Sequence, residues 1–280
     1  VVQLAIEAPV HDTEIGVQQA ELVTNAIVPT LFFGGAMFAL TGNFGAAVSP
    51  FQFDFGSGIP ISVHTTLLNA LTYAARHGIY IRSARTLETL SKVDAIVFDH
   101  VELIDRFEIE TTIATLEQQG IMLYWIHDDA LNDQTCHRDR ANHLISGLQH
   151  HGKTVAVIGN PGADQANVSI AFEDPTSTAD VILMHEDLRG VIEAIAIAKR
   201  AMQVVYENTG IIVLPNLLIQ IGGGMILGIN PIFNVITNNS SAIIAEFIHG
   251  TRPLFDHRTP TPVKQRSRSS KRSTRRMLSP

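Results

Sequence analysis

The stretch that decides the fold is KVDAIVFD at residues 92–99. Residues 95–98 are all apolar, and Asp99 follows them directly. A short apolar run of this kind is typical of a strand in the buried centre of a sheet. In open parallel α/β sheets the chemistry lies beyond the carboxyl ends of the strands, where a carboxylate can act as a nucleophile toward phosphate. The alternative is that Asp99 merely begins a turn.

The region around this strand alternates short apolar runs with helical segments. Further strands are expected at 121–126, 154–158, 169–172 and 181–184, with a strand or turn at 78–83 and helices at 86–91, 110–119, 141–149 and 187–205. This alternation predicts a parallel sheet with right-handed crossovers.

Charged residues are distributed unevenly along the 280 residues. Asp, Glu, Lys and Arg are absent from 22–53, 55–75 and 208–245. A helix needs roughly 20 apolar residues to cross a bilayer. We therefore predict a membrane α-helical protein with an α/β soluble domain, in which four helices cross the membrane near residues 22–41, 55–74, 208–227 and 231–249.

The predicted organisation has four parts. They are a lead-in helix and first pair of spans at 1–75, a soluble domain at 76–206, a second hairpin of spans at 207–256 and a basic tail at 257–280. Four spans place the soluble domain and both termini on one side of the membrane. The basic tail indicates that this side is cytoplasmic, because Lys and Arg are in excess there.

The tail is strongly basic although the whole chain has a formal net charge of −7. Between 264 and 276 it has no acid and seven cations: Lys264, Arg266, Arg268, Lys271, Arg272, Arg275 and Arg276. Beside a bilayer we expect it to bind anionic lipid, with about 1 kcal/mol per cation near the surface. An acidic face of a partner protein is the alternative, whereas nucleic acid, which such segments also bind, is not expected.

The cysteine and histidine residues do not form a recognisable metal-binding pattern in the sequence. Cys136 is the single cysteine, which excludes an internal disulfide and a cysteine-based metal cage within the chain. Five histidines lie between 127 and 151, but His137 and His143 lack the four-residue spacing of a helical metal site. A solvated surface is the simpler interpretation of these histidines.

Four stretches, at 76–90, 93–99, 153–184 and 238–254, together resemble one family. In order, they are similar to the stalk that enters its phosphorylation domain, the strand with the phosphorylated aspartate, the closing half of that domain, and the last membrane helix. From about residue 1 to residue 256 the chain thus resembles heavy-metal P-type ATPases. The resemblance implies a HAD-like Rossmann fold for the soluble domain.

The resemblance also assigns catalytic positions, and most of their motifs are altered. The assigned positions are Asp99, Asp129, Arg140, Asn160 and Asp164. The family motif Asp-Lys-Thr-Gly-Thr is DHVEL here, so the nucleophile remains, and Glu102 adds negative charge where phosphate needs donors. The second motif, Thr/Ser-Gly-Asp, is HDD and keeps only its final aspartate, while Asp128 adds another charge.

Of the three remaining assigned positions, Arg140 and Asn160 are altered as well, whereas Asp164 keeps the family's aspartate. The phosphate-binding lysine falls near Arg140, which keeps the charge but not the shape. The motif Gly-Asp-Gly-x-Asn-Asp is GNPGAD at 159–164, so the first magnesium-binding aspartate is Asn160, whose amide oxygen lacks the charge that offsets the metal. We expect no cofactor, and Mg²⁺ only if the phosphorylation site is still used.

Two whole domains of the family have no counterpart in this sequence. An ATP-binding domain separates the first two motifs in the family, whereas Asp99 and Asp129 are 30 positions apart here. The actuator domain, with its dephosphorylation motif, would precede Val1.

The metal-binding motif of the membrane helices is also replaced. The family often has Cys-Pro-Cys in its fourth core helix, which falls on FGS at 55–57 without a gap or on IPI at 59–61 with one. Neither offers thiolates for Cu(I) or Zn(II). The polar residues left as metal-site candidates are Asp54, Ser57, Asn239 and Ser241. Otherwise such groups form hydrogen bonds between helices.

Three functions fit these observations. The first is a non-catalytic pseudo-ATPase that acts as a subunit, scaffold or regulator of a membrane complex, with other membrane-protein subunits as partners. The second is ATP-driven heavy-metal transport by a pump whose missing domains another chain supplies. The third is a membrane-tethered HAD-type phosphatase, which would need an acid at Val101. Phosphoryl transfer depends on positioning and charge neutralisation, and this chain has lost most of both, so we favour the first.

Overall fold

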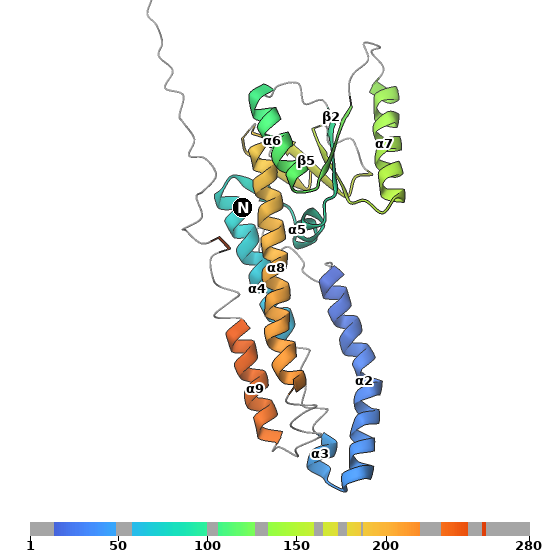
Figure 1. The fold of residues 1–280 in the computed structure, drawn as a ribbon, viewed down its shortest axis with the longest axis vertical. Coiled ribbons are helices and arrows are strands. Elements are labelled where there is room, and N and C mark those ends of the chain that lie inside the picture. The colour runs from blue at the N-terminus through green and yellow to red at the C-terminus, as the bar shows by residue number, and fades with distance from the viewer. Residues whose placement is uncertain are drawn as a thin grey trace, which may run out of the picture.

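The computed structural model describes residues 14–48, 58–99, 106–126, 134–159, 165–172, 178–185, 187–218, 231–245 and 254–255. It shows an α/β domain at one end of an elongated molecule, with long helices extending away from the sheet (Figure 1).

The sheet has six strands in the order β1-β6-β5-β4-β2-β3. Their bounds are β1 Ile79–Ile81, β2 Ala95–Asp99, β3 Met122–Ile126, β4 Val155–Ile158, β5 Val168–Phe172 and β6 Val181–Leu183. All neighbouring pairs are parallel except β1 and β6, which pair in antiparallel fashion. The predicted parallel sheet is therefore confirmed for five of the strands, and β1 is added at the edge.

Helices cover both faces of the sheet, which explains the apolar run in β2. Ile96 and Phe98 belong to the larger core, which is shared with α5 (Ala84–Ser91), α6 (Arg106–Gln118) and α8 (Arg189–Leu218). Ala95 and Val97 point to the opposite face and pack with Ile145 of α7 (Gln134–His150). Successive residues of a strand alternate between the two faces, so a strand covered on both sides must be apolar at every position.

The other helices form the elongated half of the molecule (Figure 1). They are α2 (Glu14–Thr41), α3 (Phe44–Val48), α4 (Gly58–Arg76) and α9 (Pro231–Ile243). Helix α4 packs along α8, and α9 packs against α8. Between α4 and α8, the Nδ2 of Asn208 donates to the Oγ1 of Thr66 at 3.2 Å, and both side chains are buried.

The four predicted spans fall on α2, α4, α8 and α9, with different bounds. Helix α8 runs unbroken for 30 residues and joins the predicted soluble helix at 187–205 to the start of the predicted span at 208–227. In the parts of the chain that the structure describes, no helix has both the length and the apolar character needed to cross a membrane. The structure therefore does not support the predicted transmembrane helices.

Candidate functional site at the end of strand β2

Asp99 is the last residue of β2, which lies between β3 and β4. Both neighbours run parallel to β2, and the register pairs Asp99 with Ile126 and Phe98 with Ile158. The carboxyl ends of three strands therefore meet at Asp99, as the sequence predicts. The residue is only 5% exposed.

Gly159, the residue directly after β4, approaches Asp99 closely. Its φ is +124°, and its N–H donates to the carbonyl oxygen of Ile170 at 3.1 Å. A Cβ added to Gly159 would lie 1.7 Å from the carbonyl oxygen of Asp99. Only glycine fits this position, because both the backbone angle and the space exclude a side chain. The first residue of the GNPGAD segment is thereby fixed beside the predicted nucleophile.

The structure describes only part of the predicted catalytic set. Asp129, Asn160 and Asp164 lie outside the described residues, so their place in the catalytic set stays a prediction. Arg140 is described, and it is exposed near the start of α7. Mg²⁺ takes about six oxygen ligands, several of them water, and Asp99 is the one carboxylate of the assigned set that the structure places.

The predicted metal-site residues are also only partly described. Asp54 and Ser57 lie outside the described residues. On α9, Asn239 is exposed and Ser241 is buried. Residues two apart on a helix do not face each other, so these two do not converge on one ligand. Among the described residues, no three His, Cys, Asp or Glu side chains form a group that could hold a metal ion.

Two polar contacts that hold the sheet domain together were not predicted. Asp180 accepts hydrogen bonds from the backbone N–H of Ser169 at 2.9 Å and from its hydroxyl at 2.8 Å. The guanidinium group of Arg82 donates to the carbonyl oxygen of Ala179, with both distances 3.1 Å. Arg82 and Ala179 are 97 positions apart and Ser169 and Asp180 are 11 apart, and no spacing in the sequence signals either contact.

These features define an α/β domain with a buried aspartate at the tip of a central parallel strand. Comparison with solved structures finds the same architecture in a zinc-transporting PIB-type ATPase in its E2·Pi state, with 12% identity and a TM-score of 0.68, covering 88% of this chain and 64% of that one. A zinc-transporting PIB-type ATPase in a second E2 state has 13% identity and a TM-score of 0.62, covering 87% of this chain and 66% of that one.

The fold is therefore P-type ATPase-like, with a HAD-like sheet domain, as the sequence resemblance implies. This chain spans about two thirds of the length of those two structures. No family model matches the sequence, and no curated protein matches it either. At identities this low the likeness establishes the fold alone.

Proposed function

We propose that this chain is a non-catalytic, P-type ATPase-like protein that acts as a subunit, scaffold or regulator of a membrane complex. The main support for this proposal is the short connection between β2 and β3. Asp99 and Met122 are joined through α6, a helix of 13 residues. This connection is too short to contain the ATP-binding domain that the family has between its first two motifs.

The surroundings of Asp99 support the same proposal. A nucleophile accepts a phosphoryl group only if that group can reach it. Positive charge or hydrogen-bond donors must also lie nearby. Asp99 is 5% exposed, and the sequence places Glu102 and Asp128 where the family has uncharged residues. The fold survives such changes, because apolar packing on both faces stabilises β2.

One competing function has an observation in its favour. The nucleophile position is kept at the tip of its strand, and the similar structures are zinc-transporting ATPases. An ATP-driven metal pump would need an ATP-binding domain from another chain, and Mg²⁺ would then be required as well.

Nucleotide assays separate the two functions. We expect the purified chain to hydrolyse Mg-ATP no faster than its Asp99→Asn variant, because the β2–β3 connection contains no nucleotide-binding domain. Phosphate release and equilibrium binding of labelled ATP measure this. Hydrolysis by the unmodified chain that Asp99→Asn abolishes would contradict the proposal. Hydrolysis that appears only after a second purified chain is added would favour the shared pump.

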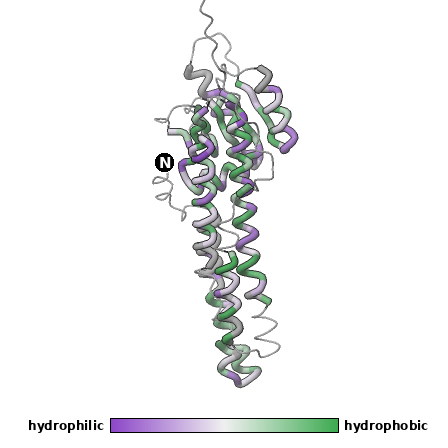
Figure 2. The backbone as a smooth tube through the Cα atoms, turned by 90° about the vertical axis from the view of Figure 1, so that its left-hand side faces the viewer, coloured by the Kyte–Doolittle hydropathy of each residue, from purple (hydrophilic) through white to green (hydrophobic). Residues whose placement is uncertain are grey.

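The proposal also places the helical half of the molecule in a membrane. Helix α2 has large apolar side chains exposed around most of its circumference: Ile27, Val28, Leu31, Phe32, Phe33, Phe38 and Leu40. Leu214 and Leu218 of α8 and Ile232 and Ile236 of α9 are exposed as well. Figure 2 shows the green, hydrophobic segments of these helices far from the sheet domain. Exposed apolar patches of this size mark protein or membrane contacts.

Two further parts of the proposal follow from this membrane placement. The sheet domain and both termini then lie in the cytoplasm, and the basic tail at 257–280, which lies outside the described residues, binds anionic lipid.

Cysteine accessibility tests the membrane placement. In a Cys136→Ser background, we expect Glu117→Cys, exposed on α6, to react rapidly with a membrane-impermeant maleimide in inside-out vesicles. Phe32→Cys should react at least ten-fold more slowly, although Phe32 is 72% exposed in the isolated chain, and should recover after detergent is added. Equal labelling rates at the two positions in intact vesicles would contradict membrane placement of α2.

A further inference from the structure

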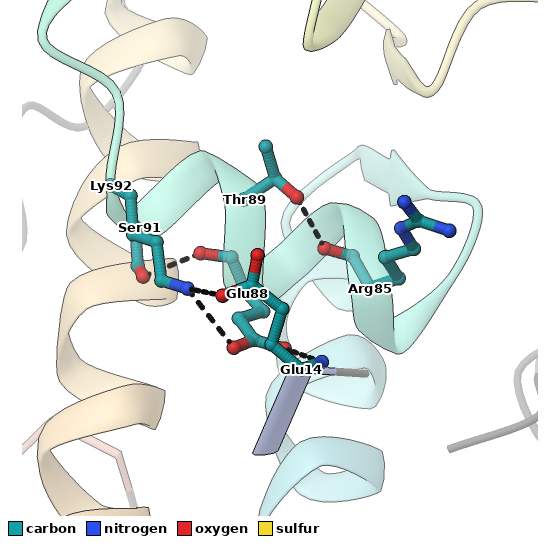
Figure 3. Close-up of polar contacts among 6 residues, drawn as sticks. All are labelled: Glu14, Arg85, Glu88, Thr89, Ser91 and Lys92. Atoms are coloured by element: carbon teal, nitrogen blue, oxygen red, sulfur yellow. Dashed lines mark hydrogen bonds and ion pairs between the residues drawn. The ribbon is translucent and has the colours of Figure 1, made fainter. Parts of the chain in front are cut away.

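Three charged residues join the first turn of α2 to helix α5 (Figure 3). The Nζ of Lys92 lies 2.5 Å from the Oε2 of Glu14 and 3.2 Å from the Oε1 of Glu88. The backbone N–H of Glu14 also donates to the Oε2 of Glu88 at 2.9 Å. We call this contact the α2–α5 joint. It connects residues 74 positions apart in the chain.

The carboxylate of Glu88 has a specific task in the joint. The first N–H groups of a helix have no partner within the helix, and a negative charge at this end is favourable. Glu14 is the first residue of α2, so Glu88 caps that helix from another element. Glu88 itself is only 3% exposed. A buried carboxylate is costly unless it is paired, so Glu88 needs both Lys92 and the N–H of Glu14.

Glu14 and Lys92 keep their charges at neutral pH. Hydrogen bonding to Lys92 and its positive charge lower the pKa of Glu14. Burial acts to lower the pKa of Lys92, but its hydrogen bonds to Glu14 and Glu88 outweigh burial and raise it. The contribution of Glu14 is lost as the pH falls through its lowered pKa, and that of Lys92 as the pH rises through its raised pKa. Between these limits Glu14 and Lys92 are both charged.

The α5 side of the joint is fixed to the strand that carries Asp99. Lys92 is the C-cap of α5, and only two residues separate it from β2. The backbone N–H of Asp94 donates to the carbonyl oxygen of Thr154 at 3.0 Å, and its Oδ2 accepts from the N–H of Thr154 at 3.2 Å. Helix α5 and β2 are therefore held as one unit with β4.

On the α2 side, the side chains that the structure describes near the joint are exposed. Val17, one turn into α2, is 50% exposed, and Glu21 is exposed as well. Within the described part of the chain, α2 packs chiefly against the short helix α3 at its far end. Figure 1 shows α2 standing apart from α4 and α8. Elements that are joined mainly by one polar contact can separate without unfolding the core of the sheet domain.

We propose that the α2–α5 joint is a separable latch between α2 and the α5–β2 unit. When it is closed, α2 has one fixed position relative to the sheet that carries Asp99. When it is open, α2 moves independently of the sheet, which keeps its own fold. A partner or surface that pulls on α2 would thereby change how the sheet domain is presented. This inference does not depend on whether Asp99 is catalytic.

Distance measurements between spin labels test the latch. In the Cys136→Ser background, labels at Glu21→Cys on α2 and Glu117→Cys on α6 should give one narrow distance distribution. Lys92→Met keeps the aliphatic stem but removes the charge, and should broaden the distribution. Glu88→Gln, which keeps the size of the side chain, should broaden it less. Thr89→Ala is the matched control, because the Thr89 hydroxyl bonds only to the carbonyl oxygen of Arg85 in the same helix, at 2.9 Å.

Hydrogen exchange on the same variants distinguishes a latch from a general structural contact. We expect Lys92→Met to speed amide exchange in the first two turns of α2 by roughly ten-fold or more, while amides of β2 and β4 keep their protection. An unchanged distance distribution in Lys92→Met would overturn the proposal. So would a parallel loss of protection in β2 and β4, because the joint would then stabilise the whole domain instead of opening alone.

Discussion

Gly159→Ala should lower the free energy of unfolding by more than about 3 kcal/mol. Two effects combine. Alanine strains the backbone at a φ of +124°, and its Cβ would lie 1.7 Å from the carbonyl oxygen of Asp99. That oxygen belongs to the backbone of a buried strand, so it cannot move away without disturbing the ladder between β2 and β4. Denaturant unfolding of the purified chain measures the loss.

Two other glycines separate these effects. Gly152 has a φ of +74° with nothing near its added Cβ, so Gly152→Ala should show the backbone cost alone, about 1 kcal/mol. Gly147 lies inside α7 with open space around it, so Gly147→Ala should be neutral or stabilising by up to about 1 kcal/mol. Comparable losses at Gly159 and Gly152 would show that the close approach to Asp99 is not the cause.

Phe98→Ala should cost about 3–5 kcal/mol, the usual loss for a large buried aromatic side chain. Phe98 is 1% exposed and is among the largest fully buried side chains. Its ring also stacks on Trp125 of β3, with centroids 4.1 Å apart and an interplanar angle of 9°. The substitution therefore leaves a cavity and removes the aromatic contact between β2 and β3.

The single tryptophan of the chain makes this measurable, because Trp125 fluorescence reports unfolding of the β2–β3 core. Trp125→Ala is the matched comparison, followed by circular dichroism. Trp125 is 37% exposed, so its loss should cost clearly less than that of Phe98. Equal costs for the two substitutions would mean that the stack, and not the burial of Phe98, stabilises this part of the sheet.

The strands of the sheet could be predicted because burial determines their composition. Residues 95–98 and 155–158 are apolar throughout, since helices cover both faces. The antiparallel pairing of β1 with β6 could not be predicted, because three residues contain no signal for direction. The continuity of α8 was also missed. The loss of charged residues after 207 marks a change of composition within α8, but it does not show whether the helix breaks there.

The part of the candidate site that is determined by the position of a strand could be predicted from the sequence. Asp99 lies where an aspartate after a buried strand should lie. Its close contact with Gly159 depends on the register of β2 and β4, which the sequence does not specify. Only one ion pair of the α2–α5 joint could be predicted from the sequence, because Glu88 and Lys92 have the four-residue spacing of a helical ion pair. Its partner Glu14 lies 74 positions from Glu88 and could not be found without the fold.

We propose that this chain keeps a P-type ATPase-like fold and its strand-end aspartate without the phosphorylation reaction. Trapping of an acyl-phosphate tests it most directly. The purified chain and its Asp99→Asn variant are incubated with labelled Mg-ATP, and in parallel with labelled inorganic phosphate, then quenched in acid and treated with hydroxylamine. We predict no hydroxylamine-sensitive label above the level of the variant under either condition. A label on the unmodified chain that hydroxylamine releases and Asp99→Asn abolishes would contradict the account.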